Sequence, residues 1–257
     1  MSAGMNDALL DQFHRVEEKH WWWAGRRKLL QLLLTDVKAG SILDIGCGTG
    51  QTMTFLRKIF PKSHLVGVDP AAAAVRYAKS RGHKEVIRST AEKLPFPSGS
   101  FDVVLFLDVL EHIPHDDQAL SEAYRVLKPG GTVIITAPAL SFIWSRHDTA
   151  QGHQRRYTRH AIRSLAAGSN FKLDFISYFN FFLSPPIIAV RLASRLKPLA
   201  FLAEYDNSMN FNVATVSPLN SLLEKIFTTE VGLLEFLRYP LGISVAARLK
   251  KPGRKEK

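Results

Sequence analysis

The chain has 257 residues, of which 46% are hydrophobic and 22% are charged. This balance excludes a disordered, collagen-like or coiled-coil chain, and the length is enough for one large globular domain with a buried core. The single cysteine, Cys47, excludes an internal disulfide and a cysteine-based zinc cluster, and it favours a reducing, cytoplasmic location.

The excess positive charge lies in the second half of the chain. The net charge is +11; residues 1–137 contain 17 basic and 15 acidic side chains, whereas residues 138–257 contain 17 basic and 8 acidic ones. This asymmetry favours an anionic partner. A nucleic acid, an anionic membrane surface and an anionic substrate are the three alternatives. A basic surface that serves only solubility is the alternative.

No transmembrane helix is predicted. The longest apolar stretch, residues 175–190, is interrupted by Asn180 and by Pro185-Pro186, and it is shorter than the ~20 residues that a membrane-spanning helix needs. The first residues also lack the basic start and apolar core of a signal peptide.

Short apolar segments alternate with helical ones from residue 41 onward. After a helix over 11–34, the sequence predicts strands at 41–45, 63–68, 85–88, 101–106 and 132–136, with helices ending at 60, spanning 71–80 and spanning 116–127. A polar loop at 139–159, a helix at 158–167 and strands at 171–178 and 242–249 follow. This order predicts an α/β fold: a doubly wound, Rossmann-like, seven-stranded and mostly parallel sheet with its ligand at the carboxyl ends of the strands.

The composition divides the chain into four segments. We expect an N-terminal helical cap at 1–40, a ligand-binding core at 41–178, an apolar insertion or cap at 179–240, and a last strand with a basic tail at 241–257.

A glycine-rich turn follows the first predicted strand, in the pattern Asp44-x-Gly46-x-Gly48-x-Gly50. Glycines let a ligand approach backbone N–H groups closely. The spacing differs from the GxGxxG of dinucleotide sites, which disfavours an NAD-dependent dehydrogenase, and the leading carboxylate favours a ligand that is cationic at this end. Asp69, at the end of the second strand, is placed to accept hydrogen bonds from both hydroxyls of a ribose.

Five segments in order carry a family resemblance: ILDIGCGTG (42–50), LVGVDP (65–70), STAEKLPFPSGSFDVV (89–104), LDVLEHIP (107–114) and RVLKPGG (125–131). Together they resemble the class I S-adenosylmethionine-dependent methyltransferases, in particular the bacterial small-molecule group. The resemblance implies S-adenosylmethionine as cofactor. It also implies the cofactor-binding residues, which are Asp44, Gly46, Cys47, Gly48, Gly50 and Asp108 near the methionine end, Asp69 and Pro70 at the ribose, and Ala91 and Glu92 at the adenine.

The methyl acceptor is harder to predict. An Asp/Asn-Pro-Pro-Tyr/Phe turn, which amino-directed nucleobase methyltransferases carry, is missing at Leu107–Leu110, and Cys47 stands in the glycine turn rather than at a nucleophile position. We therefore expect a small or lipid-linked acceptor, methylated on oxygen by in-line displacement. An RNA methyltransferase that uses the basic half as a phosphate track and a non-catalytic cofactor-binding subunit are the alternatives.

Asp108-x-x-Glu111-His112 resembles the segment that holds a divalent cation in ubiquinone-type O-methyltransferases, with Asp in place of the first Glu. The Glu-His-Ile sequence also occurs without metal in this superfamily, where it orients the loop. We predict that no metal is required. His112 is a candidate base, and a structural hydrogen bond is its alternative role.

The loop from Trp144 to Tyr157 concentrates His, Arg, Asp and Tyr side chains after the fifth strand, where the acceptor is expected to approach. His153 and Tyr157 are candidate catalytic residues, and Arg155 and Arg156 are candidates to bind an anionic group of the acceptor. A network of Arg and Asp that pins the loop to the core is the alternative. Trp22, within three adjacent tryptophans, is a candidate to cover the cleft and bind the acceptor.

The insertion combines apolar and basic residues. Its Phe179, Phe181, Phe182, Ile187 and Ile188 suit a lipid-like pocket, a membrane interface or an ordinary subdomain core. The basic residues Arg191, Arg195 and Lys197 follow them, as expected of a surface helix near anionic headgroups. The sequence therefore predicts a cytoplasmic protein with peripheral contact to the inner face of a membrane as an option.

Overall fold

The computed structural model describes residues 7–195 and 218–253. Its centre is a seven-stranded sheet in the order β3-β2-β1-β4-β5-β7-β6. The strands are β1 (Ser41–Ile45), β2 (His64–Asp69), β3 (Val86–Arg88), β4 (Phe101–Leu107), β5 (Leu127–Pro138), β6 (Lys172–Phe179) and β7 (Ser244–Lys250). The strands β1 to β5 pair in parallel, and β7 runs antiparallel to both β5 and β6. The predicted fold class is confirmed.

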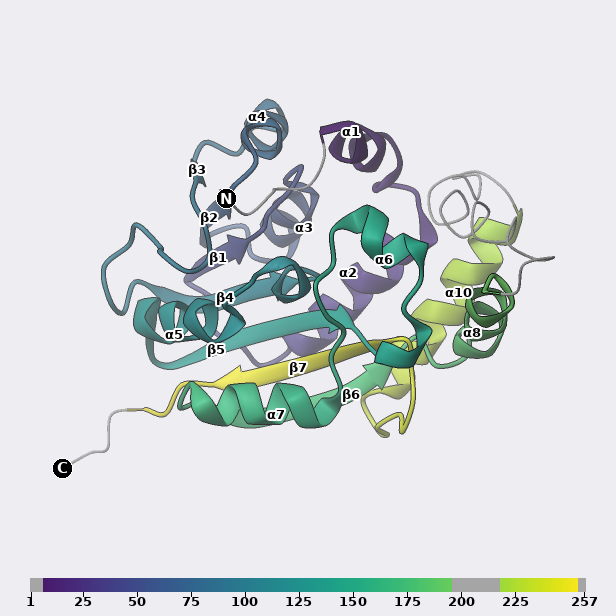
Figure 1. The fold of residues 1–257 in the computed structure, drawn as a ribbon. Helices are drawn as coiled ribbons and strands as arrows, with labels where there is room; N and C mark the ends of the chain where they lie inside the picture. The colour runs from purple at the N-terminus through teal and green to yellow at the C-terminus, as the bar shows by residue number, and fades with distance from the viewer. Residues whose placement is uncertain (1–6, 196–217, 254–257) are drawn as a thin grey trace.

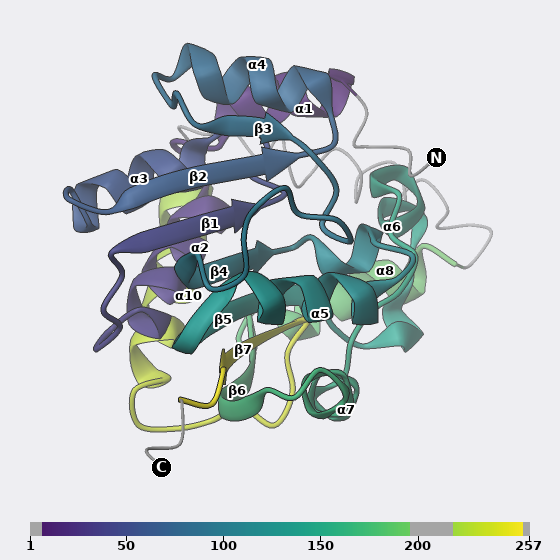
Figure 2. The ribbon, with the colours of Figure 1, turned by 90° about the vertical axis from the view of Figure 1, so that its left-hand side faces the viewer.

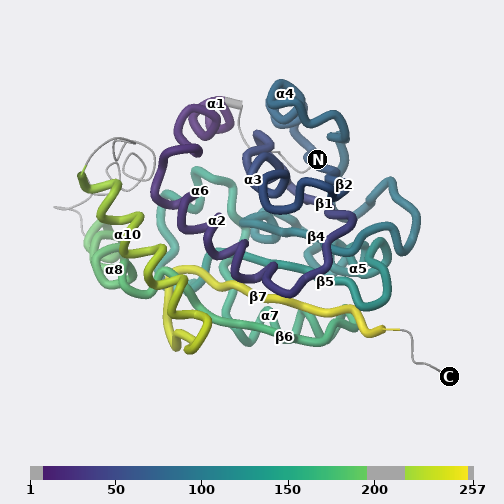
Figure 3. The backbone as a smooth tube through the Cα atoms, turned by 180° about the vertical axis from the view of Figure 1, so that it is seen from behind, coloured from purple at the N-terminus to yellow at the C-terminus, as the bar shows by residue number. Residues whose placement is uncertain are grey.

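Helices cover both faces of the sheet because most strands are apolar on both sides. The helices α5 (Asp116–Val126) and α7 (Arg159–Gly168) lie on one face, and α2 (Trp21–Leu33) and α10 (Pro218–Leu233) lie on the other (Figures 2 and 3). Two further helices, α3 (Gln51–Ile59) and α4 (Ala72–Ser80), connect the first three strands. The strand order reverses between β1 and β4, which is where such folds bind ligands.

The N-terminal segment forms two helices where the sequence predicted one. Helix α1 (Asp7–Val16) ends before His20, and α2 begins at Trp21. The break is stabilised by the His20 imidazole, which accepts a hydrogen bond from the backbone N–H of Trp22 at 3.2 Å and so caps α2. The Trp22 ring stacks on Phe179 of β6, with 6.1 Å between the ring centroids.

Helix α2 packs closely on α10 at Gly25. A Cβ atom there would lie 2.1 Å from the Phe227 ring, so only glycine permits this approach. The segment before β1 is therefore fixed against the segment before β7, as the Trp21–Asn220 hydrogen bond also shows, with 199 positions of sequence separating its two residues (Figure 3).

The predicted polar loop after β5 contains a 3₁₀ turn, η2 (Ser141–Ile143), and a short helix, α6 (Arg146–Gln151). Ser145 and Asp148 form a reciprocal capping box at its start. The helix has six residues, too few for periodicity to reveal it in the sequence.

The insertion joins β6 to β7 and contributes α8 (Ser184–Ala193) and α10 to the described structure. Figure 1 shows both helices at the end of the sheet where α6 also lies. Glu230 of α10 is fully buried and accepts hydrogen bonds from the backbone N–H groups of Phe181 (2.9 Å) and Phe182 (3.0 Å), which ties the insertion to the end of β6. The division into four segments remains a prediction. Within the described ranges, no helix combines the length and apolarity that crossing a bilayer requires.

Candidate active site

A cavity of about 360 Å³ lies at the carboxyl ends of β1 and β4. Residues from the N-terminal helices, the glycine turn, α6 and the insertion all line it. Of the predicted site residues, it brings together Trp22, Asp44, Gly46, Cys47, Gly48, Asp108, His112, His153 and Arg156. The chain thus encloses the end of the sheet where a doubly wound fold binds its ligand.

The glycine turn forms the floor of the cavity. Gly46 has φ 67°, and a Cβ atom there would lie 2.5 Å from the Val109 side chain. Gly50, at φ 81°, precedes α3, and a Cβ atom there would meet Ala78 at 2.9 Å. Cys47 is buried beneath the turn, and burial raises the pKa of its thiol well above the ordinary value, so the thiol is neutral.

Asp69 ends β2 and fixes the turn. Its carboxylate accepts hydrogen bonds from the backbone N–H groups of Gly48 (3.0 Å) and Ala71 (2.8 Å). Burial raises the pKa of Asp69 above the ordinary value, although these two hydrogen bonds act to lower it. Pro70 follows directly, and Ala91 and Glu92 follow β3 at the same edge of the sheet, but none of the four residues predicted to hold the ribose and adenine lines this cavity.

Two acids and one arginine meet at the ends of β1 and β4. Asp44 is buried, its Oδ2 has no hydrogen-bond partner in the described structure, and burial raises its pKa to about 7. Asp108 has φ 58°, a strained conformation that directs its carboxylate to the Arg26 guanidinium at 2.9 Å. The contact of Arg26 with Asp108 could not be predicted from the sequence, because nothing local connects α2 to the end of β4.

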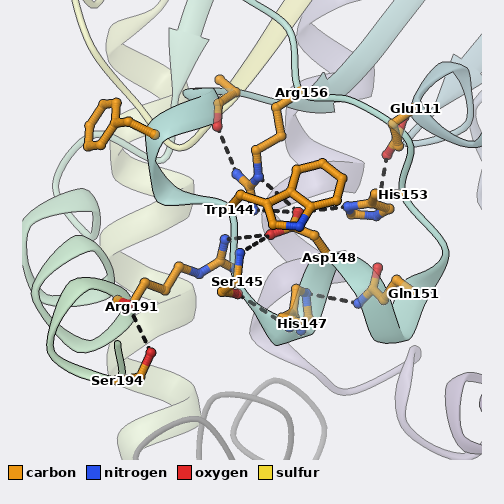
Figure 4. Close-up of polar contacts among 12 residues, drawn as sticks. Glu111, Trp144, Ser145, His147, Asp148, Gln151, His153, Arg156, Arg191 and Ser194 are labelled. Carbon is orange, nitrogen blue, oxygen red and sulfur yellow. Dashed lines mark hydrogen bonds and ion pairs between the residues drawn. The ribbon is translucent and has the colours of Figure 1, made fainter. Parts of the chain in front are cut away.

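The carboxylate of Asp148 is the centre of a buried polar cluster (Figure 4). His153 Nδ1 lies 2.9 Å from Oδ1, Arg156 donates to the same oxygen from Nε (2.8 Å) and Nη2 (2.7 Å), and the Ser145 N–H donates to Oδ2 at 2.9 Å. Arg191 of α8 lies 3.8 Å from Oδ2. Burial alone would raise the pKa of Asp148, but the His153 hydrogen bond and the Arg156 charge outweigh it, so the pKa lies well below its ordinary value.

Neutral groups surround this cluster. Burial lowers the pKa of His112 to about 4 and that of His147 to about 3, with the Arg191 charge as the second cause for His147. Glu111 is fully buried, and burial raises the pKa of its carboxyl group well above the ordinary value, which favours the neutral form. Its Oε1 lies 4.0 Å from His153 Nε2.

Metal ligation is geometrically accessible to Glu111, His112 and His153, whose ligand atoms lie within 4.8 Å of one another. This trio differs from the Asp108-x-x-Glu111-His112 pattern of the sequence, because the Asp108 carboxylate pairs with Arg26. His153 would ligate through Nε2 while Nδ1 stays on Asp148.

Tyr157 and Arg155 lie outside the cavity, which corrects the predicted roles in catalysis and acceptor binding. Tyr157 is buried and donates its hydroxyl to Asp116 at 2.7 Å, and Arg155 forms an ion pair with the same carboxylate at 2.7 Å. They pin the loop to α5, as the alternative interpretation held. Arg156 lines the cavity, but its guanidinium is taken up by Asp148 and by the carbonyl of Ala139 (2.7 Å), so it positions Asp148 instead of meeting a ligand directly.

The insertion contributes differently from the prediction. Ile187 lines the cavity, whereas Phe179 is fully buried between Trp22 and Phe227. Phe181 stacks on Tyr239, Phe182 is exposed, and Ile188 packs on the core outside the cavity. Of the predicted basic surface, Arg191 is buried at 5% exposure, which contradicts its placement near headgroups, whereas Arg195 is exposed and donates to the carbonyl of Trp144 at 3.0 Å. Lys197 lies outside the described residues.

A seven-stranded sheet with an antiparallel β7, a glycine turn after β1 and an acid at the end of β2 define a Rossmann-like methyltransferase fold. Residues 43–135 match the family model described as "Methyltransferase domain". A ubiquinone/menaquinone biosynthesis C-methyltransferase UbiE from Pseudomonas paraeruginosa is 31% identical over 156 residues, which are 56% of this chain and 57% of that protein. The chain therefore spans just over half the length of this curated relative.

Solved structures share the fold. A putative methyltransferase of Haloferax volcanii, in complex with the Trm112 methyltransferase activator, has a TM-score of 0.62 at 17% identity. The aligned region is 98% of this chain and 97% of that one. A Haemonchus contortus phosphoethanolamine N-methyltransferase 2, in complex with S-adenosylhomocysteine, has a TM-score of 0.57 at 20% identity over 86% of this chain and 52% of its own. Residues 43–135 therefore form a class I S-adenosylmethionine-dependent methyltransferase domain, with S-adenosylmethionine as methyl donor.

Proposed function

We propose that the chain methylates a hydroxylated, largely apolar small or lipid-linked molecule on oxygen, with His153 as general base. The observation that carries the proposal is the pairing of His153, which lines the cavity, with the buried Asp148 behind it. S-adenosylmethionine supplies a methyl group on a sulfonium, and the protein must align the acceptor with it and remove the acceptor's proton.

The Asp148 carboxylate fixes the tautomer of His153. A carboxylate that is ionised at neutral pH accepts a hydrogen from Nδ1, so Nε2 carries the lone pair. Nε2 takes the hydroxyl proton, the oxygen forms a bond to the methyl carbon, and the carbon–sulfur bond breaks with its electron pair on sulfur. The Asp148 charge stabilises the imidazolium that results, as a carboxylate does in other Asp–His pairs.

The residues near the glycine turn fit the cofactor. Asp44 has a buried carboxylate oxygen without a partner in the described ranges, which suits the ammonium group of a methionine moiety. Gly46 and Gly48 line the cavity, and no atom lies within 4 Å of a Cβ position at Gly48, so the turn leaves room there for it. Gly50 is retained in the cofactor turn as part of the proposal. We retain Cys47 in the turn, Asp69 and Pro70 at the ribose, Ala91 and Glu92 at the adenine and Asp108 near the methionine as parts of this proposal.

The acceptor half of the cavity is mainly apolar. Trp22, Leu183, Ile187 and Leu223 line it beside the Asp148 cluster. An apolar wall with one polar end suits an acceptor with a hydrophobic body and a hydroxyl. A phosphate track for RNA needs accessible basic groups, and Arg156 and Arg191 are buried beside Asp148. Peripheral membrane contact and a cytoplasmic location stay predictions, although Arg191 of the basic cluster that favoured the contact is buried.

Methylation on carbon is a second candidate, because the curated relatives are named C-methyltransferases at 31–34% identity. Removal of a proton from a ring hydroxyl also activates the carbon next to it, so the same base would serve both outcomes.

A methyl-transfer screen tests the proposal. The protein is incubated with S-adenosylmethionine labelled at the methyl group and with alkylphenols, alkylated dihydroxybenzenes, aliphatic alcohols, fatty acids or total RNA. We expect label in the phenolic substrates, and mass spectrometry of the product then separates methoxy from ring-methyl compounds. Label that enters RNA alone would contradict the proposal.

A further inference from the structure

Asn180 presents an unsatisfied side chain to the cavity. It follows β6 at the start of the insertion, is fully buried, and is part of the cavity lining. Neither its Oδ1 nor its Nδ2 has a hydrogen-bond partner among residues 7–195 and 218–253. A buried amide without partners is unfavourable, so a polar group that reaches it from a ligand gains both hydrogen bonds.

The backbone around Asn180 is fixed without help from its side chain. The residue has φ 59°, in the left-handed region that asparagine tolerates better than most residues. Its carbonyl accepts a hydrogen bond from Ser184 Oγ at 2.6 Å, and Glu230 holds the next two N–H groups. These contacts maintain the strained conformation, and the carboxamide is left to face the cavity.

We propose that Asn180 binds a second, uncharged oxygen of the methyl acceptor, a hydroxyl or a carbonyl. The inference rests on the proposed function and deepens it, since it assigns the acceptor two oxygen groups on an apolar body. A carboxamide both donates and accepts, which matches an uncharged oxygen group. Its neighbours in the lining, Leu183 and Ile243, offer no charge to balance an ionised one, whereas charged groups gather at Asp148.

Such an arrangement discriminates strongly between acceptors. A site that hydrogen-bonds one oxygen of its substrate rejects an analogue without it, because the buried polar atoms of the protein are then left unpaired. Asn180 is therefore a specificity-determining residue that contacts the acceptor away from the reacting hydroxyl.

Thermal unfolding tests whether the side chain has a structural role. Asn180→Gly relieves the positive φ and removes both unsatisfied atoms, so we expect a Tm within about 2 °C of the wild type. Asn170→Gly is the matched control, since Asn170 has φ 62°, is exposed and does not line the cavity. A loss of more than about 6 °C in Asn180→Gly alone would show that the asparagine supports the fold, and would overturn the proposal.

Calorimetric titration tests recognition directly. The probes are 4-hexylphenol and the isomeric hexyl-substituted catechols, resorcinols and hydroquinone, titrated under nitrogen into protein saturated with S-adenosylhomocysteine. We expect at least one dihydroxybenzene to bind about tenfold more tightly than 4-hexylphenol to the wild type and to Asn170→Gly. In Asn180→Gly, and in Asn180→Leu, which retains most of the side-chain volume, the gain should fall below about twofold.

The proposal would be overturned if the second hydroxyl did not increase the affinity for the wild type. It would also be overturned if the increase in affinity persisted in both Asn180 variants. The titration does not depend on methyl transfer, so the two proposals fail separately. If the affinity gain depends on Asn180 but none of the probes is ever methylated, the binding site proposed here is supported and the proposed reaction is refuted. If phenols are methylated but their affinity does not depend on Asn180, the proposed reaction is supported and the role of Asn180 is refuted.

Discussion

Arg191 of the insertion lies 3.8 Å from the carboxylate of Asp148 in α6, and both side chains are buried. The contact connects a helix between the last two strands to the acid that orients His153 (Figure 4). The insertion is therefore part of the wall of the site and contributes to its electrostatics.

Replacing Arg191 should weaken catalysis without removing the cofactor. Arg191→Met retains an apolar stem but removes one cation from Asp148, which leaves the buried carboxylate less compensated, at a cost of roughly 1–3 kcal/mol in the free energy of unfolding. Urea unfolding and methyl-transfer rates measure the two effects. Arg195→Met, on the exposed side of the same segment, is the control and should change both by little. Equal effects in the two variants would refute a special role for Arg191.

Cofactor affinity should rise with pH through about 7. Burial raises the Asp44 pKa to about 7, and the ionised form is the one that attracts the ammonium group of the cofactor. In the free protein the raised Asp44 pKa makes the folded state less stable as the pH rises from about 4 to 7. The folded state retains a proton in this range that the unfolded state has lost. Calorimetry across pH 5.5–8.5, in solvents of equal ionic strength, checks the affinity.

Asp44→Asn should bind S-adenosylmethionine roughly 10- to 100-fold more weakly at pH 8 and lose the pH dependence. A pH profile that is the same in the wild type and in Asp44→Asn would exclude Asp44 from the methionine end. Tighter binding of NAD than of S-adenosylmethionine would contradict the cofactor assignment itself.

Two glycines in neighbouring helices should respond oppositely to the same substitution. Gly25→Ala places a Cβ atom 2.1 Å from the Phe227 ring, so we expect a loss of roughly 1–3 kcal/mol in the free energy of unfolding. Gly232→Ala in α10 meets nothing within 4 Å and should stabilise the protein by about 0.5–1 kcal/mol, because alanine favours a helix. Denaturant unfolding of both variants measures the difference. A stabilising Gly25→Ala would refute the close packing of α2 on α10.

Chelation should leave the activity intact. The proposed base uses His153 Nε2 directly, and a cation shared by Glu111, His112 and His153 would occupy that atom. We expect the same methyl-transfer rate before and after dialysis against EDTA. Loss of activity on dialysis, restored by a divalent cation, would assign the trio to metal binding and remove His153 as the base.

The sequence was sufficient for the core because its information is local. Asp44, Gly46 and Asp69 each stand at or next to the end of a strand, and the carboxyl ends of parallel strands meet at one edge of the sheet. Asn180, Arg26 and Arg191 could not be predicted, because only the packing of α2 and the insertion brings them to the cavity. Tyr157 and Arg155 were misplaced for a related reason: the turn after α6 directs them to Asp116 rather than to the cavity.

The rate of a single turnover in His153→Gln tests the central claim most directly. Labelled S-adenosylmethionine at saturating concentration is mixed with a phenolic acceptor identified by the screen, and the methylated product is followed over time. His160→Gln, at an exposed position of α7, is the control. The account predicts a loss of roughly 10²- to 10⁴-fold for His153→Gln, with unchanged cofactor affinity and a normal rate for His160→Gln. A normal rate in His153→Gln would contradict it.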